Sequence, residues 1–324
     1  MGKKKATTTK IENPISIMGQ DANQKILSRA IELNLPVLLI GETGTGKTSI
    51  IRERAFIEGA DLIRVNLNGQ TSVDEIVGKW LIKGGATYWQ DGVLIQAMKK
   101  GSWILIDEIN ASLPEVLFAL HSLLDDDRKI IIAEKDGEEV KPHPDFRFFA
   151  TMNPSEEYAG TKELNKAFLS RFPVILDFDF LPPKDEIMLL EARSGISHQD
   201  ASLLVNFATR IRELKTKQEI FYTLSTRDLI FWANFVQELG LGDSFRIAVL
   251  NRAYNGDKEI LIREYRTMIG KIDEYLKKYG VGSVTDIFAS IDKREDELKN
   301  RELKLNQIKK EIAEGSIEAL LKGI

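Results

Sequence analysis

Residues 35–49 read LPVLLIGETGTGKTS, and this stretch decides the fold of the chain. Residues 35–40 are apolar, as expected for a parallel strand that is buried on both faces of a sheet. The residues that follow match the phosphate-loop pattern G-x-x-x-x-G-K-[ST]. A helix is predicted from residue 49, and its N-terminus adds the positive end of a helix dipole. The order of strand, glycine-rich loop and helix predicts a nucleoside triphosphate site rather than a simple turn.

The phosphate-loop residues have separate expected roles. Glycines let the backbone turn tightly and aim N–H groups at phosphate oxygens, and Lys47 is expected to reach the β- and γ-phosphates. The hydroxyl of Thr48 is expected to bind Mg²⁺. The predicted nucleotide-binding residues are Gly41, Glu42, Thr43, Gly44, Thr45, Gly46, Lys47, Thr48 and Ser49.

Composition sets the bounds on the rest of the chain. With 324 residues two domains are expected, and the formal net charge of −4 gives no bulk electrostatic case for binding nucleic acid or an anionic membrane. The sequence has no cysteine, which excludes thiolate metal sites, and its three histidines lack metal-binding spacing. No apolar run approaches the roughly 20 residues that span a bilayer. Residues 1–10 are basic without an apolar core, so we expect a disordered tail and a cytoplasmic protein.

A second motif places two carboxylates after an apolar strand. Residues 103–106 read WILI and are followed by Asp107 and Glu108. Ligands bind at the carboxyl ends of the strands in an open parallel sheet, so both side chains are expected at the nucleotide. Asp107 is predicted to hold Mg²⁺ through water, as an acidic residue after a second strand does in phosphate-loop enzymes. Glu108 is predicted to act as the general base for the attacking water.

The remaining pattern alternates strands and helices and then becomes entirely helical. Residues 78–91 predict a hairpin around Gly84-Gly85, and Asp136-Gly137 predicts a second hairpin. A strand over residues 146–152 ends at Asn153, whose amide is suited to orient the attacking water. After residue 181 the predicted helices cover residues 184–193, 199–214, 226–239, 244–254 and 258–268.

Five motifs in one order resemble the AAA+ ATPases, nearest to the MoxR-like and dynein/midasin-related group. They are GETGTGKT at 41–48, WILIDE at 103–108, ATMNP at 150–154, LNKAFLSRF at 164–172 and LSTRDL at 224–229. The resemblance implies an α/β fold: a parallel-sheet core with β-hairpin insertions, a small all-helical lid and a C-terminal helix. The expected organisation is a tail at 1–12, a nucleotide-binding domain at 13–181, a lid at 182–270 and a helical extension at 271–324.

The resemblance also implies roles for three polar residues. Asn153 matches the sensor-1 residue, Arg171 the arginine finger offered to the ATP of a neighbouring subunit, and Arg227 the sensor-2 residue. Together with Glu108 they form the expected catalytic set. Ser225 and Asp228 are spaced as a capping pair, which puts Arg227 on the first turn of a helix. A finger supplied by another subunit implies a ring, taken to be a hexamer, and a monomer with little activity.

The expected function is that of an ATP-hydrolysing ring that remodels a protein or protein complex. By resemblance its cofactors are ATP and Mg²⁺, and a separate von Willebrand factor A-domain protein is a candidate partner. The alternatives are the ATPase subunit of a metal chelatase or cofactor-insertion complex, a nucleic-acid-associated motor or assembly platform, and a non-hydrolysing ring. The acidic balance of the chain disfavours nucleic acid, and the presence of Glu108, Asn153 and Arg171 disfavours a ring without hydrolysis.

Two further features have open interpretations. Trp80, Tyr88 and Trp89 of the first predicted hairpin are suited either to grip a substrate or to form the core of the hairpin. Apolar residues recur every seventh position at 291, 298, 305 and 312, but arginines interrupt the second half of the pattern. The segment is expected to be a solvated terminal helix, with a partner-binding coil as the alternative.

Overall fold

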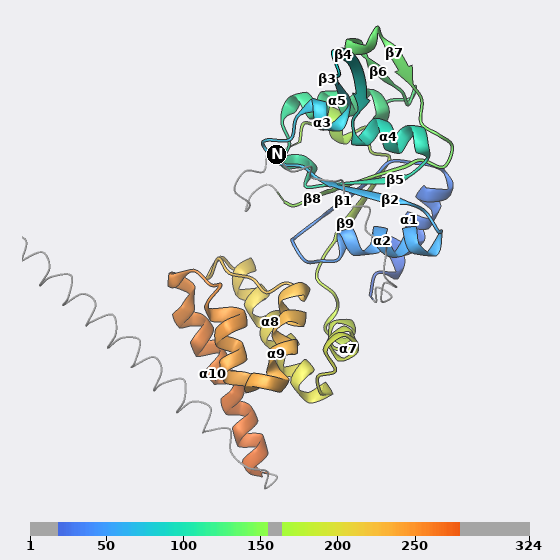
Figure 1. Cartoon of the computed structure of the whole chain (residues 1–324). Coiled ribbons are helices and arrows are strands. Elements are labelled where there is room, and N and C mark those ends of the chain that lie inside the picture. Colours follow the sequence, from blue (N-terminus) through green and yellow to red (C-terminus); the bar gives the residue numbers. More distant parts are fainter. Residues whose placement is uncertain (1–18, 155–163, 279–324) are drawn as a thin grey trace, which may run out of the picture. The chain divides into compact units, whose positions relative to one another are not determined.

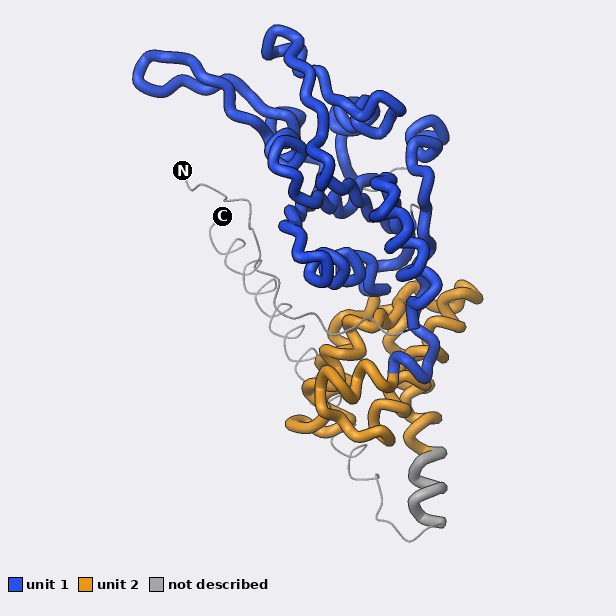
Figure 2. Tube along the Cα trace, turned by 90° about the vertical axis from the view of Figure 1, so that its right-hand side faces the viewer, with its two compact units in different colours: residues 1–186 blue, residues 187–324 orange. Residues whose placement is uncertain are grey.

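The computed structural model describes residues 19–154 and 164–278 of the chain. The chain divides into two compact units, Met1–Glu186 and Ile187–Ile324, shown in blue and orange in Figure 2. The predicted N-terminal tail and the seven-residue repeat at 291–312 lie outside the described residues. Among the described helices, none combines the length and the apolar composition needed to cross a membrane.

Unit 1 is built on a five-stranded sheet in the order β2-β5-β8-β1-β9, and neighbouring strands are parallel throughout (Figure 1). The predicted α/β fold is therefore confirmed. β5 is buried along its whole length and β1 along most of it, as their apolar sequences predict. The strands are β1 (Val37–Gly41), β2 (Leu62–Asn66), β5 (Trp103–Asp107), β8 (Arg147–Met152) and β9 (Val174–Phe178).

Alternate side chains of the strands enter two separate hydrophobic clusters. Leu39 and Leu105 pack with α1 (Asp21–Glu32) and α2 (Lys47–Ile57) on one face of the sheet. Since successive strand residues point to opposite faces, this division covers both sides of the sheet with helices. The phosphate loop joins β1 to α2 on the first of these faces.

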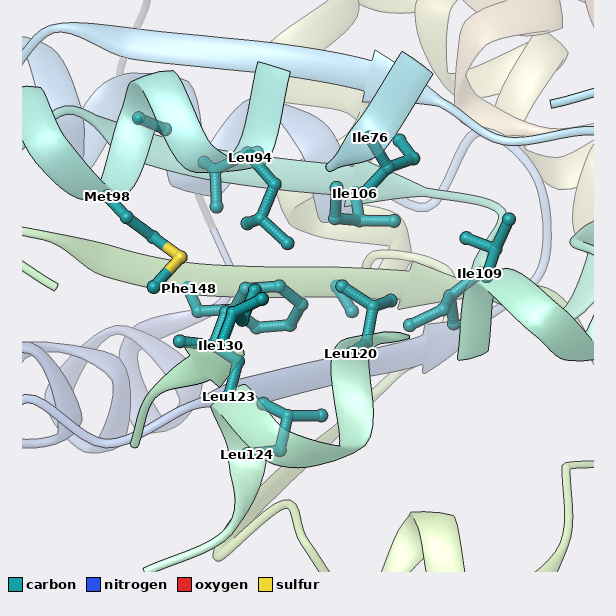
Figure 3. Close-up of a cluster of buried hydrophobic side chains, with 14 of the residues drawn as sticks. Ile76, Leu94, Met98, Ile106, Ile109, Leu120, Leu123, Leu124, Ile130 and Phe148 are labelled. Carbon is teal, nitrogen blue, oxygen red and sulfur yellow. The ribbon is translucent and has the colours of Figure 1, made fainter. Parts of the chain in front are cut away.

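The second cluster lies against α3 (Val73–Ile76), α4 (Val93–Lys100) and α5 (Pro114–Leu124). In Figure 3, side chains of α4 and α5 surround Ile106 and Phe148 of the sheet. This packing fixes the position of β5, whose end carries the two acidic residues.

Both predicted hairpins are confirmed, and a hydrogen bond joins them. β3 (Gly78–Lys83) pairs with β4 (Ala86–Asp91), and β6 (Ile130–Ile132) pairs with β7 (Glu138–Val140). The indole N–H of Trp80 in β3 donates to the carbonyl oxygen of Glu134, in the turn between β6 and β7, at 2.8 Å.

Unit 2 is helical, as predicted, around a core of Phe207, Trp232, Phe245 and Tyr265. The helix break predicted after residue 239 is confirmed, because α9 (Thr226–Phe245) is kinked at Gly240, whose φ of 71° and ψ of 174° are not helical. The helix boundaries after this point differ from the predictions. A π-helical segment at Arg246–Leu250 follows directly, and α10 (Asn255–Lys278) continues past the expected boundary at residue 270. The other helices are α7 (Pro183–Ser194) and α8 (His198–Thr216).

Candidate nucleotide site

The phosphate loop depends on glycine at both of its ends. Gly46 caps α2 with φ 97°, a left-handed conformation that other residues rarely adopt. At Gly41 a Cβ atom would lie 2.2 Å from the carbonyl oxygen of Phe178 in β9, so only glycine fits against that strand. The loop therefore delivers the N-terminus of α2, with the backbone N–H groups of its first turn, to the carboxyl edge of the sheet.

Lys47 is buried at this edge and is bound by its own loop. Its Nζ donates to the carbonyl oxygens of Gly41 at 2.7 Å and Glu42 at 2.8 Å, and to Oδ1 of Asn153 at 3.1 Å. Two residues separated by 106 positions in the sequence thus meet between β1 and β8. This contact joins the phosphate loop to the predicted sensor-1 residue.

Asp107 accepts hydrogen bonds from both sides of the sheet edge. Its Oδ1 accepts from Oγ1 of Thr48 at 3.1 Å and from Oγ1 of Thr151 at 2.8 Å, and its Oδ2 pairs with the guanidinium of Arg64. The carboxylate is 3% exposed, and Arg64 provides the opposite charge that a buried carboxylate requires.

The donor set at Thr48 and Asp107 fits Mg²⁺. A hydroxyl and a carboxylate offer hard oxygen ligands, and Mg²⁺ is commonly bound by one or two such groups together with substrate phosphates and water. Among the described residues no group of three or more His, Cys, Asp and Glu side chains is arranged to hold a metal ion by itself. The phosphate oxygens of a nucleotide would complete the set.

Glu108 follows Asp107 in a left-handed conformation, with φ 58° and ψ 44°. Its side chain is exposed, unlike that of Asp107, while its backbone N–H donates to Oγ1 of Thr151 at 3.2 Å. A non-glycine residue with positive φ is uncommon and needs surrounding structure to hold it. One threonine hydroxyl therefore fixes both acidic residues at the end of β5.

A buried neighbour holds the backbone of Asn153 in place. Nδ2 of Asn110 donates to the carbonyl oxygen of Asn153 at 2.9 Å, and Asn110 is 1% exposed. This contact fixes the end of β8 against the short turn after Glu108, so the amide of Asn153 stays directed at Lys47.

Arg171 lies apart from this group. It follows α6 (Lys166–Leu169), and its Nε donates to Oδ1 of Asp125 at 2.6 Å while Nη1 donates to the carbonyl oxygen of Ala167 at 2.5 Å. Its partners thus come from the end of α5 and from α6 rather than from the phosphate loop. Burial lowers the pKa of His121 below its ordinary value, and the positive charge of Arg171 lowers it further.

Arg227 belongs to unit 2 and is exposed on the first turn of α9. The predicted capping pair is confirmed. Oγ of Ser225 accepts from the backbone N–H of Asp228 at 3.2 Å, and the Asp228 carboxylate accepts from the backbone N–H of Ser225 at 3.1 Å. The role of Arg227 at a nucleotide stays a prediction.

The hairpin aromatics divide into two kinds. Trp80 and Trp89 pack edge to face with ring centroids 5.6 Å apart, and Trp89 also packs against the core of unit 1. Trp89 thus holds the hairpin to the rest of the unit. Trp80, Tyr88 and Ile82 are exposed, Trp80 by 50% and Ile82 by 79%. These three side chains are available for a partner.

The sequence did not single out Arg64, Thr151 or Asn110. Arg64 shares one face of β2 with Leu62 and Asn66, and Asn66 pairs with Asp107 of β5, so Arg64 faces the same side of the sheet as Asp107. The signal available for Arg64 was its charge, because a charged residue within a short strand needs a partner of opposite charge and Asp107 ends the neighbouring strand. Thr151 lies within the quoted motif ATMNP, and Asn110 lies two residues after the acidic pair.

Comparison with known proteins agrees with this geometry. Residues 36–172 match the AAA domain of the dynein-related subfamily, and residues 186–260 match the CbbQ/NirQ/NorQ C-terminal domain. The chain is 34% identical to protein NorQ of Paracoccus denitrificans (strain Pd 1222) over 212 residues, which cover 65% of this chain and 77% of that protein.

Two further relatives differ in how much of their length is matched. Midasin of Giardia intestinalis is 37% identical over 191 residues, 58% of this chain but 4% of midasin. The aerobic cobaltochelatase subunit CobS of Sinorhizobium sp is 26% identical over 253 residues, 73% of this chain and 76% of that subunit. The chain belongs to the MoxR-like AAA+ ATPases, with a dynein-related AAA domain followed by a C-terminal domain of the CbbQ/NirQ/NorQ type.

Proposed function

We propose that this protein is a Mg²⁺-dependent ATP hydrolase that assembles into a ring, a hexamer in the simplest case, with each ATP bound between two subunits. The observation that carries the proposal is the meeting of Lys47, Asp107 and Asn153 at the carboxyl edge of the sheet, where Lys47 contacts Asn153 and Thr48 contacts Asp107. Ligands of open α/β sheets bind outside this edge.

Each residue of the group has a task in hydrolysis. The loop N–H groups and Lys47 bind the phosphates, and Asn153 orients the attacking water. Glu108 is exposed beside them and accepts the proton of that water. Mg²⁺ bound by Thr48 and, through water, by Asp107 would offset the negative charge of the phosphates.

Arg171 supplies the remaining positive charge from a neighbouring subunit. Its hydrogen-bond partners, Asp125 and Ala167, lie outside its own phosphate loop, which supports action in trans. An arginine finger of this kind contributes about 10³–10⁵ in rate. Arg227 acts as the sensor that couples the nucleotide to motion of the helical lid.

The ring uses this motion to remodel a protein or protein complex in the cytoplasm, with a separately encoded von Willebrand factor A-domain protein as its partner. Membership of the MoxR-like AAA+ ATPases supports this substrate class. The similarity to CobS favours one second candidate, the ATPase subunit of a metal chelatase. A Glu108→Gln ring that holds ATP without hydrolysing it would capture the partner and separate these candidates.

The test measures ATPase rate per subunit against protein concentration, with particle mass recorded alongside. Wild type, Glu108→Gln and Arg171→Ala are compared with two controls, Glu115→Gln and Arg29→Ala, which change equivalent charges outside the site. We expect the rate per subunit to rise as rings form and to be lost in both site variants, while Glu108→Gln still binds ATP. A rate independent of concentration, or one indifferent to Arg171, would refute the shared-site mechanism.

A further inference from the structure

We propose that Asp125 is a positioning residue that sets the guanidinium of Arg171 for the nucleotide of the neighbouring subunit. The inference rests on the proposed function, in which Arg171 acts in trans. Its basis is the ion pair between Nε of Arg171 and Oδ1 of Asp125 at 2.6 Å. The carbonyl oxygen of Ala167 binds Nη1 at 2.5 Å from a second direction.

These two contacts leave Nη2 of the guanidinium available. The group carries five N–H donors in a planar fork, and Asp125 and Ala167 accept from Nε and Nη1. Within the part of the chain that the structure describes, Nη2 has no hydrogen-bond partner. The side chain is 26% exposed and borders a cavity of about 850 Å³ that Asp125 also lines. A guanidinium held in a fixed plane, with Nη2 available, is preorganised to donate to phosphate oxygens.

Asp125 is poorly placed to stabilise the fold by itself. It caps the C-terminus of α5, where the helix dipole disfavours a negative charge, and Asp126 and Asp127 add like charges beside it. Its side chain is 48% exposed, and ion pairs at that exposure contribute little stability. The contact with Arg171 therefore accounts for this carboxylate better than stability does.

The two helices that carry the contacts are fixed to each other. The ring of His121 in α5 stacks on the ring of Phe168 in α6, with centroids 5.0 Å apart and an angle of 25° between the planes. Phe168 is buried and in turn packs edge to face on Phe172, the residue after Arg171. Asp125 thus acts from a rigid platform, as precise orientation of a charged group at a reaction centre requires.

The experiment compares the ATPase kinetics of Asp125→Asn with those of Asp126→Asn, which makes the same charge change at the next residue. We expect kcat of Asp125→Asn to fall about 10- to 100-fold, the cost of a misplaced catalytic group, with KM for ATP within about twofold of wild type. Asp126→Asn should keep the wild-type kcat. In the Arg171→Ala background, Asp125→Asn should cause no further loss, because its effect passes through that arginine.

Mixed rings add a readout that a general structural defect would not give. Asp125→Asn subunits keep Glu108, and Glu108→Gln subunits keep an intact Asp125 and Arg171. Mixing the two should restore activity above that of either variant alone, since some sites then combine a sound Glu108 with a sound finger.

Each outcome bears on one of the two proposals. Normal kinetics of Asp125→Asn beside an inactive Arg171→Ala would overturn the positioning role and leave the proposed function in place. A faster Asp125→Asn, or a further loss in the Arg171→Ala background, would also overturn it. A fully active Arg171→Ala would instead refute the trans-acting finger, and the positioning role with it.

Discussion

Replacing Thr151 with valine would remove the hydroxyl that joins the two acidic residues at the end of β5. Thr151 is 3% exposed, and its Oγ1 donates to the Asp107 carboxylate at 2.8 Å and accepts from the Glu108 N–H at 3.2 Å. One hydrogen bond to a charged group and one to a backbone N–H together contribute roughly 2–4 kcal/mol to the free energy of unfolding. Valine keeps the shape of threonine, so little of the loss comes from packing.

The assay is chemical denaturation of the apo-protein followed by circular dichroism, with Thr151→Ser as the matched control. Serine keeps the hydroxyl and loses only a methyl group, so Thr151→Ser should retain most of the stability that Thr151→Val loses. The ATPase rate of Thr151→Val should fall as well, because Asp107 and Glu108 lose their common contact. A Thr151→Val protein whose free energy of unfolding lies within about 0.5 kcal/mol of wild type would refute this account.

Two further changes test other parts of unit 1. Gly41→Ala places a Cβ 2.2 Å from the Phe178 carbonyl oxygen, so thermal melting should show that the free energy of unfolding falls by about 3 kcal/mol or more. The control is Gly69→Ala, whose Cβ meets no atom within 4 Å, and it should melt like wild type. The pKa of His121 is lowered from 6.5, by burial and then by Arg171, so the folded protein binds fewer protons than the unfolded chain and loses stability as pH falls through that value. The drop in melting temperature between about pH 7.5 and about pH 5.5 should therefore be smaller in His121→Asn than in wild type. Equal drops in the two proteins would contradict the assignment.

Local signals in the sequence predicted most of the fold. The apolar runs before Gly41 and Asp107 predicted buried strands, and the Gly84-Gly85 and Asp136-Gly137 pairs predicted both hairpins. Each of these signals acts over a few neighbouring residues, so the rest of the chain is not needed to interpret it. The local signal at Gly240 also held, because the backbone there is not helical and α9 is kinked where the predicted helix ends.

The candidate site was predictable only where motifs mark it. Lys47, Thr48 and Asp107 belong to patterns with fixed spacing, and the structure brings Thr48 and Asp107 into contact. The pairing of Arg64 with Asp107 depends on β2 lying beside β5, which the strand order decides and no local pattern reveals. The partner of Arg171 was equally hidden, because Asp125 is 46 residues away in the chain.

The contacts of Lys47 make nucleotide binding an exchange reaction. Its ammonium group already donates to the carbonyl oxygens of Gly41 and Glu42 and to the amide oxygen of Asn153. A ligand that recruits this group must offer better acceptors, since only the difference between the two sets of interactions contributes to affinity. Phosphate oxygens do so, because their charge adds an attraction that neutral oxygens lack. A nucleoside offers only uncharged acceptors and so lacks this added attraction. The loop therefore discriminates by charge before base or sugar is recognised.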